Sequence, residues 1–565
     1  MEQKWILKDE NHHDMIDCFY QKLKIPRNLG KILISRGIDS VEKVVRYFKT
    51  NIDDLYDPFL FADMEKAVDR IIRAIKNKEK ILVYGDYDVD GITAVSLIYL
   101  YLESIGAEVS YYIPDRITEG YGISNAGIDE AQRRGVTLIV SVDCGITAID
   151  EIAYARSKNI DIIVSDHHEP GCSLPQAYAL LDPKCAQSNY PFSELAGVGV
   201  AYKLAQALNQ KLNLDSELLE QYLDLVAVGT IADIVPLIDE NRILVKDGLE
   251  RLNETRKPGL QALLNVTGLQ SKMITTGQIV FIIAPRINAV GRMGDAERAV
   301  SLLTTQNVHQ ARNVASILES ENRLRKDIDE QTFKEAMVIA EQQFHTGKDF
   351  TLVLDQEGWH PGVIGIVASR IVEKFYRPTI MISVEEGIGR GSARSIVGFD
   401  IYSALKQCED LLVTFGGHKY AAGLTIEQTK IPLFRERINA ISREMMTEDL
   451  LVPKLNIDSE LDFSEINDRF IHLLKLMAPF GPKNLRPIFM SRNLQVVGSP
   501  SIVGNNHLKF KVRQNAHVFD TIGFNLGDKY YRLSPGETSL DLAYVVEENE
   551  YLGRVNLQLR IKDLR

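Results

Sequence analysis

Cysteine is scarce in this chain of 565 residues, and its few copies are widely spaced. No two of them form a Cys-x-x-Cys pair, which argues against a structural zinc module and gives no disulfide framework. We therefore expect free thiols in a reducing, cytoplasmic compartment. The five cysteines are Cys18, Cys144, Cys172, Cys185 and Cys408.

Long apolar runs are also missing. The chain has no stretch of about 18 apolar residues, the length that a membrane-spanning helix needs. It also has no positively charged N-terminus followed by an apolar segment, so we predict neither a membrane span nor a signal peptide.

Positive charge is in deficit, with 65 Lys and Arg against 77 Asp and Glu and a net charge of −12. A DNA-binding face is usually basic, so this balance taken alone argues against a nucleic-acid partner. A protein that acts on nucleic acid can nevertheless be acidic overall and still carry a basic groove. Carboxylates that bind divalent cations also add negative charge without repelling phosphate once the cations are bound.

The length indicates several domains, since one hydrophobic core rarely serves more than about 250–300 residues. We predict a multidomain α/β protein in five parts. They are an N-terminal helical segment (1–45), a parallel-sheet α/β domain (46–305), a long connecting helix (306–346), a smaller α/β domain (347–450) and a C-terminal β-barrel of the OB-fold type (451–565).

Alternation of apolar and helical segments supports this division. The strands expected in the first α/β domain are Ile81–Tyr84, Val109–Ile113, Thr137–Val142 and Ile160–Ser165. Residues 306–344 contain neither Gly nor Pro and are rich in good helix formers, which predicts one long helix. The five short strands expected in the barrel are Asn493–Val497, His507–Val512, Val518–Phe524, Leu540–Val546 and Arg554–Ile561.

Four short segments carry carboxylates, and most of them end an apolar run. They are Tyr84–Gly91, Val142–Gly145, Ser165–His168 and Gly229–Asp233. Open α/β sheets bind ligands at the carboxyl ends of their strands, so these side chains should converge there. Carboxylates with a minority of histidine suit Mg²⁺ or Mn²⁺. One carboxylate can bridge two ions about 3.5–4 Å apart, and Asp143 is our candidate for that bridge.

A purely structural interpretation must be weighed against this one. A lone Asp-x-Asp after a strand is often a cap or a turn, and adjacent histidines usually lie at the surface. Four such segments in order are much harder to explain in that way.

The sequence Asp166-His167-His168 resembles the signature of the DHH phosphoesterases, and the four segments match that superfamily's four motifs in order. Further segments resemble the RecJ-like branch of this family, and the likeness runs from about residue 45 to the end. They are Pro285–Met293, Gly389–Ser395, Phe415–Gly423 and Pro479–Asn484, of which the second and third resemble the associated DHHA1 domain.

Two departures from the family pattern stand out. Val89 replaces an alanine that many members have, which does not affect the chemistry. Lys483-Asn484-Leu485 replaces the usual Gly-Asn-Pro, which leaves open the hinge geometry before the barrel.

The resemblance implies two Mn²⁺ or Mg²⁺ ions. Asp88 and Asp143 would hold one ion, while Asp90, Asp143, His167 and Asp233 would hold the other. Asp86 is left open between a direct ligand and an outer partner. His168 would contact phosphate, and Asp166 would orient a neighbouring imidazole or backbone group.

On the substrate side, Gly389–Ser395 is a candidate phosphate cradle, because glycines let backbone N–H groups approach oxygen. Ser392 would donate a hydrogen bond and Arg394 a bidentate fork to a 5′ phosphate. The further expected contacts are Arg286, Asn288, Arg292, Arg390, Gly391 and His418. The alternatives are an inter-domain salt bridge for Arg394 and a structural loop role for His418.

The barrel region combines aromatic with basic side chains, which suits stacking of bases along a single strand. Aromatics in strands are more often core, so the stacking residues stay open. The aromatics are Phe489, Phe510, Phe519, Phe524, Tyr530 and Tyr531, near Lys509, Lys511 and Arg513.

The expected activity is hydrolysis of single-stranded DNA from the 5′ end, releasing 5′ mononucleotides, in DNA repair and recombination. The resemblance also implies a monomer that works with single-strand-binding protein and a helicase. Other DHH enzymes are the nearest alternative: an oligoribonuclease, a cyclic-dinucleotide phosphodiesterase or a pyrophosphatase. A non-catalytic binding relative is a more distant one, because every expected ligand is present.

Overall fold

A computed structural model describes residues 3–8, 12–115, 118–293, 295–345, 349–536, 539–551 and 554–565. It divides into two compact units. One contains residues 7–319 together with 457–565, and the other contains residues 1–6 together with 320–456. Within the described residues, no helix is long and apolar enough to cross a membrane.

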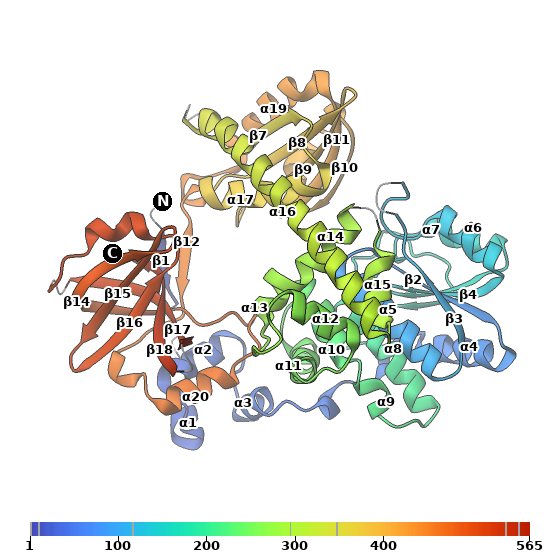
Figure 1. The fold of residues 1–565 in the computed structure, drawn as a ribbon, viewed down its shortest axis with the longest axis horizontal. Helices are drawn as coiled ribbons and strands as arrows, with labels where there is room; N and C mark the ends of the chain where they lie inside the picture. Colours follow the sequence, from blue (N-terminus) through green and yellow to red (C-terminus); the bar gives the residue numbers. More distant parts are fainter. Residues whose placement is uncertain are drawn as a thin grey trace. The chain divides into compact units, whose positions relative to one another are not determined.

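A five-stranded parallel sheet organises the first α/β domain, in the order β3-β2-β4-β5-β6 (Figure 1). Its strands are β2 (Lys80–Gly85), β3 (Glu108–Tyr112), β4 (Val136–Val142), β5 (Asp161–Ser165) and β6 (Ala179–Leu181). Four of them match the predicted strands, which confirms the parallel α/β assignment. Gly85 is paired with Val142, and Val142 with Ser165, so three strand ends lie in one row.

Helices cover both faces of this sheet because alternate strand residues are apolar on each side. Ile81 and Val83 share one core with α5 and α8, while Leu82 and Tyr84 share another with α6 and α7. The helices on the first face are α4 (Met64–Asn77), α5 (Val89–Ser104), α8 (Gly197–Lys211) and α10 (Leu223–Ala232). Those on the second are α6 (Asn125–Arg134) and α7 (Ile149–Ser157).

Further helices complete this domain and lead out of it. They are α9 (Glu217–Glu220), α11 (Asp239–Asn253), α12 (Pro258–Val266), α13 (Thr276–Gln278), a π-helical turn (Ile279–Ile283), α14 (Ala284–Met293) and α15 (Glu297–Thr304). The long helix predicted from the missing Gly and Pro is α16, Val308–His345.

The smaller α/β domain has a mixed sheet in the order β10-β11-β9-β8-β7. Only β7 and β8 run parallel, and the other neighbours are antiparallel. The strands are β7 (Leu352–Glu357), β8 (Thr379–Glu385), β9 (Ile388–Arg394), β10 (Leu412–His418) and β11 (Ala421–Glu427). The helices are α17 (Pro361–Phe375), α18 (Ile401–Lys406) and α19 (Ile431–Met445).

A five-stranded closed barrel forms the C-terminal domain, as predicted, because β14 pairs with both β15 and β17. Its strands are β14 (Phe489–Val503), β15 (His507–Gln514), β16 (His517–Gly523), β17 (Leu540–Tyr551) and β18 (Arg554–Leu564). The short strand β13 (Ser459–Glu460) and helix α20 (Asp468–Leu476) precede it.

The N-terminal helices share a hydrophobic core with the barrel rather than forming one alone. Phe19 and Leu29 belong to the same buried cluster as Phe463 and Phe470. These helices are α1 (His13–Leu23), α2 (Arg27–Ser35) and α3 (Val41–Phe48). In addition, β1 (Lys4–Leu7) pairs with β12 (Lys454–Ile457). The beginning of the chain therefore packs on its last third, which the sequence pattern did not predict.

Candidate metal centre and phosphate-binding residues

Strand register brings the acidic motifs together at one edge of the parallel sheet. Gly85, Val142 and Ser165 are aligned across three neighbouring strands. The residues that follow them, Asp86, Asp143 and Asp166, therefore leave the sheet side by side. All three are buried.

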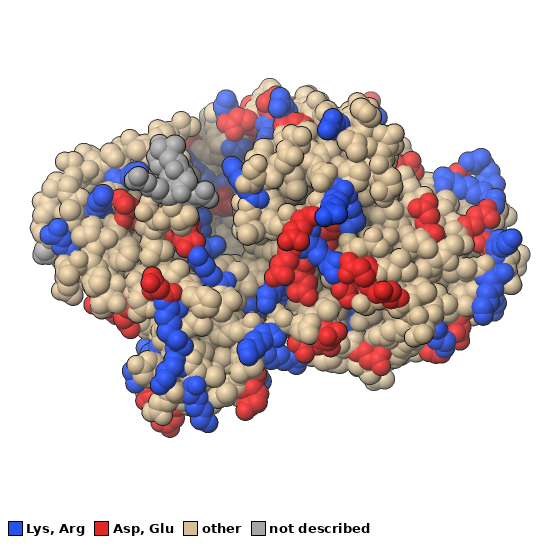
Figure 2. Space-filling model, turned by 60° about the horizontal axis from the view of Figure 1, so that its bottom comes forward, with Lys and Arg blue, Asp and Glu red and all other residues tan. Residues whose placement is uncertain are grey.

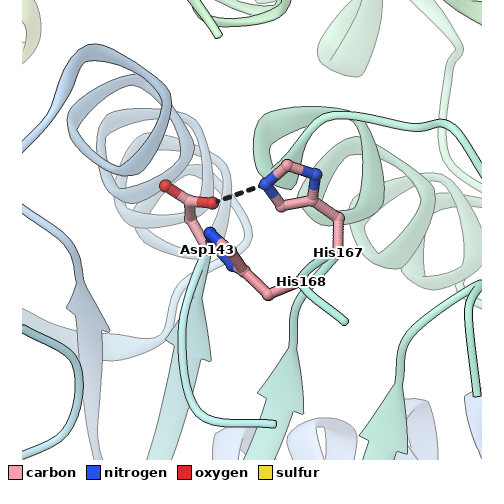
Figure 3. A group of neighbouring side chains, drawn as sticks. All are labelled: Asp143, His167 and His168. Carbon is pink, nitrogen blue, oxygen red and sulfur yellow. Dashed lines mark ion pairs between the residues drawn. The ribbon is translucent and has the colours of Figure 1, made fainter. Parts of the chain in front are cut away.

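The predicted ligands form overlapping groups around Asp143. The Nε2 atom of His167 lies 3.2 Å from Asp143 Oδ1, 3.7 Å from Asp233 Oδ2 and 3.9 Å from Asp90 Oδ2. Figure 3 shows the carboxylate of Asp143 and the His167 ring turned toward each other, with His168 beside them.

Three sets of side chains bring their ligand atoms within 4.8 Å of one another. They are Asp90, His167 and Asp233; Asp86, Asp88 and Asp143; and Asp143, His167 and His168. Asp143 and His167 each belong to two of these sets. Of the two, only Asp143 has a carboxylate, whose two oxygens can bridge a pair of ions.

Two helix N-termini fix the carboxylates of the first motif. Asp88 caps α5 by accepting the backbone N–H of Gly91 at 3.1 Å. Asp90 accepts the N–H groups of Gly197 at 2.6 Å and Val198 at 2.8 Å, at the start of α8. Free N–H groups at a helix start hold an anion well, so the Asp90 carboxylate is locked in place.

Glycine is required where the backbone passes close to these carboxylates. A Cβ atom on Gly197 would lie 2.4 Å from Asp143 Oδ1, and one on Gly229 would lie 3.0 Å from Asp90 Oδ1. Our sequence reasoning did not include Gly197 or Val198, and it named Gly229 only as the first residue of the fourth motif. The Gly-x-Gly that opens α8 was the available signal.

Burial and mutual repulsion raise the pKa of several carboxylates at this site. Burial raises the pKa of Asp90 and Asp143 well above the usual range, and the charges of neighbouring aspartates raise it further. Burial and the charge of Asp88 raise the pKa of Asp233 to about 7. A divalent cation among these groups would favour their ionised forms.

His167 has the protonation state of a ligand. Burial, with the charge of His168, lowers its pKa to about 3, so the ring is neutral near pH 7. A neutral imidazole offers a lone pair, and this one faces carboxylate oxygens that themselves seek a cation. The donor set contains only carboxylate and imidazole in the described residues, which fits Mn²⁺ or Mg²⁺.

Asp166 organises the backbone and His168 rather than pointing at the ligand cluster. It accepts the N–H groups of Ile146 at 2.9 Å and His167 at 2.7 Å, and it lies 2.8 Å from His168 Nδ1. Although burial disfavours the charged ring, the hydrogen bond and charge of Asp166 raise the pKa of His168 to about 9. His168 is thus a cation that can face a phosphate.

Tyr121 is a further residue near this centre that the sequence reasoning missed. Its hydroxyl lies 3.0 Å from His168 Nε2, and its ring packs edge-on against Tyr87. Gly120 and Gly122 flank it, both with positive φ. The Gly-Tyr-Gly sequence was the signal that could have drawn attention to it.

The predicted phosphate contacts on α14 differ in their surroundings. Arg286 is buried, and it pairs with Glu319 at 2.6 Å and donates to the carbonyl of Ile282. A phosphate contact by Arg286 would require this pair to open. Asn288 is half-buried on the same helix, and the side chain of Arg292 lies outside the described part of the structure.

The predicted backbone cradle at Gly389–Ser395 is wrong. Residues 388–394 form strand β9, whose backbone pairs with β8 on one side and β11 on the other. Its glycines serve packing instead, since a Cβ atom on Gly389 would lie 2.6 Å from Ile382 and one on Gly391 would lie 2.8 Å from Leu424.

The surroundings of Arg394, the last residue of β9, suit the predicted contact with a phosphate. Its guanidinium donates to Ser392 Oγ at 3.1 Å and to the carbonyl of Ala393 at 2.8 Å. Burial lowers its pKa, and no carboxylate pairs with it among the residues the structure describes. A half-buried cation of this kind suits an anionic ligand. Arg390 and His418 are exposed on β9 and β10.

The barrel separates its aromatic residues into two classes. Phe489 and Phe510 are buried in the core, whereas Phe524, Tyr530 and Tyr531 are exposed. Basic residues on β15 alternate with buried ones and face outward: Lys509, Lys511 and Arg513. On the face drawn in Figure 2, Lys and Arg are interspersed with Asp and Glu rather than gathered into one broad basic patch.

Comparison with known families matches three parts of the chain. Residues 80–230 match the DHH family N-terminal domain, residues 348–444 match the DHHA1 domain, and residues 457–563 match the RecJ OB domain.

Curated relatives match nearly the whole chain. The single-stranded-DNA-specific exonuclease RecJ of Bacillus subtilis (strain 168) is 39% identical over 97% of this chain and 69% of its own length. The protein of the same name from Escherichia coli (strain K12) is 35% identical over 96% of both chains.

Solved structures agree with these matches. The crystal structure of RecJ in complex with Mn²⁺ from Thermus thermophilus has a TM-score of 0.85 at 27% identity, covering 100% of this chain and 79% of that one. The Mg²⁺ complex from the same organism has a TM-score of 0.78 at 27% identity, with coverage of 100% and 78%.

Proposed function

This chain belongs to the RecJ family of DHH phosphoesterases, and we propose that it removes 5′ mononucleotides one at a time from single-stranded DNA. It is a single-stranded-DNA-specific exonuclease that uses Mn²⁺ or Mg²⁺. The observation that carries the mechanistic proposal is the meeting of two ligand sets, Asp86, Asp88 and Asp143 in one and Asp90, His167 and Asp233 in the other, where His167 Nε2 lies 3.2 Å from Asp143 Oδ1.

Two ions would be held by the residues of these sets. Asp90, His167 and Asp233 would bind one ion, Asp86 and Asp88 the other, and Asp143 both. When bound, such ions activate water for attack on phosphorus and stabilise charge on the phosphate oxygens. The buried, mutually repelling carboxylates and the neutral His167 support this assignment.

The chain's own residues would position the substrate around this centre. The His168 imidazolium, held by Asp166, would contact a phosphate oxygen at the site of cleavage. The α8 N–H groups keep Asp90 oriented, so little reorganisation is needed when the ester binds.

Recognition of the 5′ end would fall to the second unit. We assign the 5′ phosphate to Arg394 and Ser392, with Arg390 and His418 as further contacts to the strand. Asn288 and Arg292, which belong to the other unit, stay assigned to the DNA strand, whereas Gly391 is dropped because its backbone is paired within the sheet. The half-buried guanidinium of Arg394, with no carboxylate beside it in the described residues, supports this assignment. Binding of the 5′ phosphate at Arg394 would set the 5′ to 3′ direction of degradation.

An end-labelled digestion tests the proposal. Single strands carrying a 5′ phosphate and a 3′ label should shorten from the 5′ end in Mn²⁺, releasing mononucleotides, and should stay intact in chelator. Label retained on a steadily shortening strand supports 5′ to 3′ degradation. Immediate release of the label as mononucleotide would contradict it.

The nearest alternative is another DHH activity on small substrates. Pyrophosphate, cyclic dinucleotides and short oligoribonucleotides should be turned over far more slowly than long single-stranded DNA. The C-terminal barrel with exposed aromatic and basic residues favours the long substrate. Faster turnover of any small substrate would favour the alternative.

We place this activity in DNA repair and recombination, in the cytoplasm, with the enzyme acting as a monomer. Single-strand-binding protein and a helicase are the proposed partners, because a helicase separates a duplex into single strands and single-strand-binding protein occupies them. Five cysteines without a disulfide fit a reducing compartment.

A further inference from the structure

The backbone directly after Asp233 is strained. Asp233 follows the last residue of α10, and the next residue, Ile234, has φ of 63°. A β-branched residue rarely adopts the left-handed conformation, because its side chain crowds the backbone. Such a conformation persists only where its surroundings hold it, and it tends to occur at functional sites.

The holding contact comes from a loop more than 200 residues away, Ala478–Asn484, which leads into the barrel. The backbone N–H of Leu237 donates to the carbonyl of Pro482 at 2.9 Å. Gly481 packs so closely on Leu237 that a Cβ atom there would lie 2.6 Å from Leu237 Cδ1. Leu237 is itself buried.

The same loop is fixed internally and to its neighbours. Buried Asn484 donates through its amide to the carbonyls of Met477 at 2.9 Å and Pro479 at 2.7 Å. Thr276 donates its hydroxyl to the carbonyl of Phe480 at 2.8 Å. The loop is thus a rigid support rather than a flexible linker.

Arg242 adds a second anchor from the helix that follows the strained segment. Its buried guanidinium donates to the carbonyls of Met477 at 2.9 Å and Leu476 at 3.1 Å. It pairs with no carboxylate in the described residues, and burial lowers its pKa. Through these hydrogen bonds Arg242 fixes the position of the backbone at Leu476 and Met477.

We propose that the loop Ala478–Asn484 is a positioning element for Asp233, so that the barrel domain completes the metal centre as well as binding DNA. This rests on the proposed function, in which Asp233 is a metal ligand. Pinning Leu237 fixes both ends of the short segment from Asp233 to Leu237, and the carboxylate can then meet Asp90 and His167. Loosening the loop would let Ile234 relax and Asp233 turn away.

The test measures Mn²⁺ binding to metal-free, full-length protein by calorimetric titration, alongside thermal unfolding. Gly481→Ala drives a methyl group into Leu237 and should weaken one of the two Mn²⁺ sites about 10-fold, the lower end of effects seen when outer supports of a ligand are lost. The other site should keep its affinity. The kcat should fall at limiting Mn²⁺ and recover at saturating Mn²⁺.

Two companion variants sharpen the result. Thr276→Val removes one support of the loop without adding volume, so it should fold and weaken the same site about 2–3-fold. Leu237→Ala combined with Gly481→Ala removes the collision, so the double variant should bind Mn²⁺ more tightly than Gly481→Ala alone. Gly277→Ala, at a nearby glycine whose Cβ would meet nothing closer than 3.8 Å, is the matched control and should leave both sites unchanged.

The possible outcomes distinguish a failure of the positioning role from a failure of the proposed function. Unchanged Mn²⁺ affinity in both Gly481→Ala and Thr276→Val, even with a lower Tm, would overturn the positioning role while the wild type still binds two ions. A wild type that binds no pair of Mn²⁺ ions would instead overturn the proposed function.

Discussion

The acidic edge of the parallel sheet, which is buried, and the end of strand β9, which is half-buried, carry charge of opposite sign. At the sheet edge, Asp90 and Asp143 are 1% and 2% exposed, and burial among like charges raises the pKa of both. At β9, burial lowers the pKa of Arg394, which has no carboxylate partner in the described residues. Each region is therefore suited to a ligand of opposite charge, divalent cations in the first and phosphate in the second.

The largest effect should come from removing the shared carboxylate. Asp143→Ala should lower kcat more than about 10³-fold, because loss of even one electrostatic contact at a reacting centre costs roughly 10²–10³-fold. Binding of single-stranded DNA should stay largely intact. Activity assays with filter-binding measurements check this, and turnover near the wild-type rate would remove the bridging role.

A smaller and more selective effect should follow at the cationic region. Arg394→Ala should raise KM about 10–100-fold for 5′-phosphorylated strands, since a charged hydrogen bond is worth about 1.5–3 kcal/mol. Strands with a 5′ hydroxyl should be affected much less. Arg437→Ala is the control, because Arg437 pairs with Asp410 at the surface. An equal loss on both kinds of strand would contradict the 5′-phosphate assignment.

The sheet edge should also make metal-free stability depend on pH. The pKa of Asp233 is about 7 in the folded protein, against about 3.9 for an unfolded aspartate. Between these values the native state holds more protons, so its unfolding free energy falls as pH rises.

Thermal unfolding checks this directly. The Tm in chelator should fall by several degrees between about pH 5 and pH 8, and the gain in Tm on adding Mn²⁺ should grow over the same range. Asp233→Asn should flatten the slope in chelator. A gain from Mn²⁺ that did not change with pH would count against ionised carboxylates as its ligands.

The smallest effect should come from the glycines of β9. Gly389→Ala would place a methyl group 2.6 Å from Ile382, so overpacking should cost about 1 kcal/mol of unfolding free energy. Urea denaturation measures the loss, and KM for 5′-phosphorylated DNA should not change. A selective rise in that KM without loss of stability would restore the backbone cradle that the strand pairing contradicts.

The sheet edge and strand β9 also differ in how well the sequence predicted them. At the sheet edge, an apolar run followed by an acidic motif fixes both the strand and the position of the carboxylate, because parallel strands end at one edge. The spatial proximity of Asp86, Asp143 and Asp166 then follows from register alone.

In β9 the same kind of reasoning failed. Gly389 and Gly391 indicated a phosphate cradle, but their small size serves close packing between two neighbouring strands. Glycine alone does not distinguish a phosphate-binding turn from a crowded strand. The Gly-x-Gly at the start of α8 marked a special backbone position, but no local pattern connects it with Asp90, nor Pro482 with the segment after Asp233.

Anomalous diffraction from crystals grown with Mn²⁺ would show whether Asp143 bridges a pair of ions. We expect two manganese peaks about 3.5–4 Å apart, on either side of the Asp143 carboxylate. One should be bound by Asp90, His167 and Asp233, and the other by Asp86 and Asp88. A single peak, or a pair of ions that leaves Asp143 uncoordinated, would contradict it.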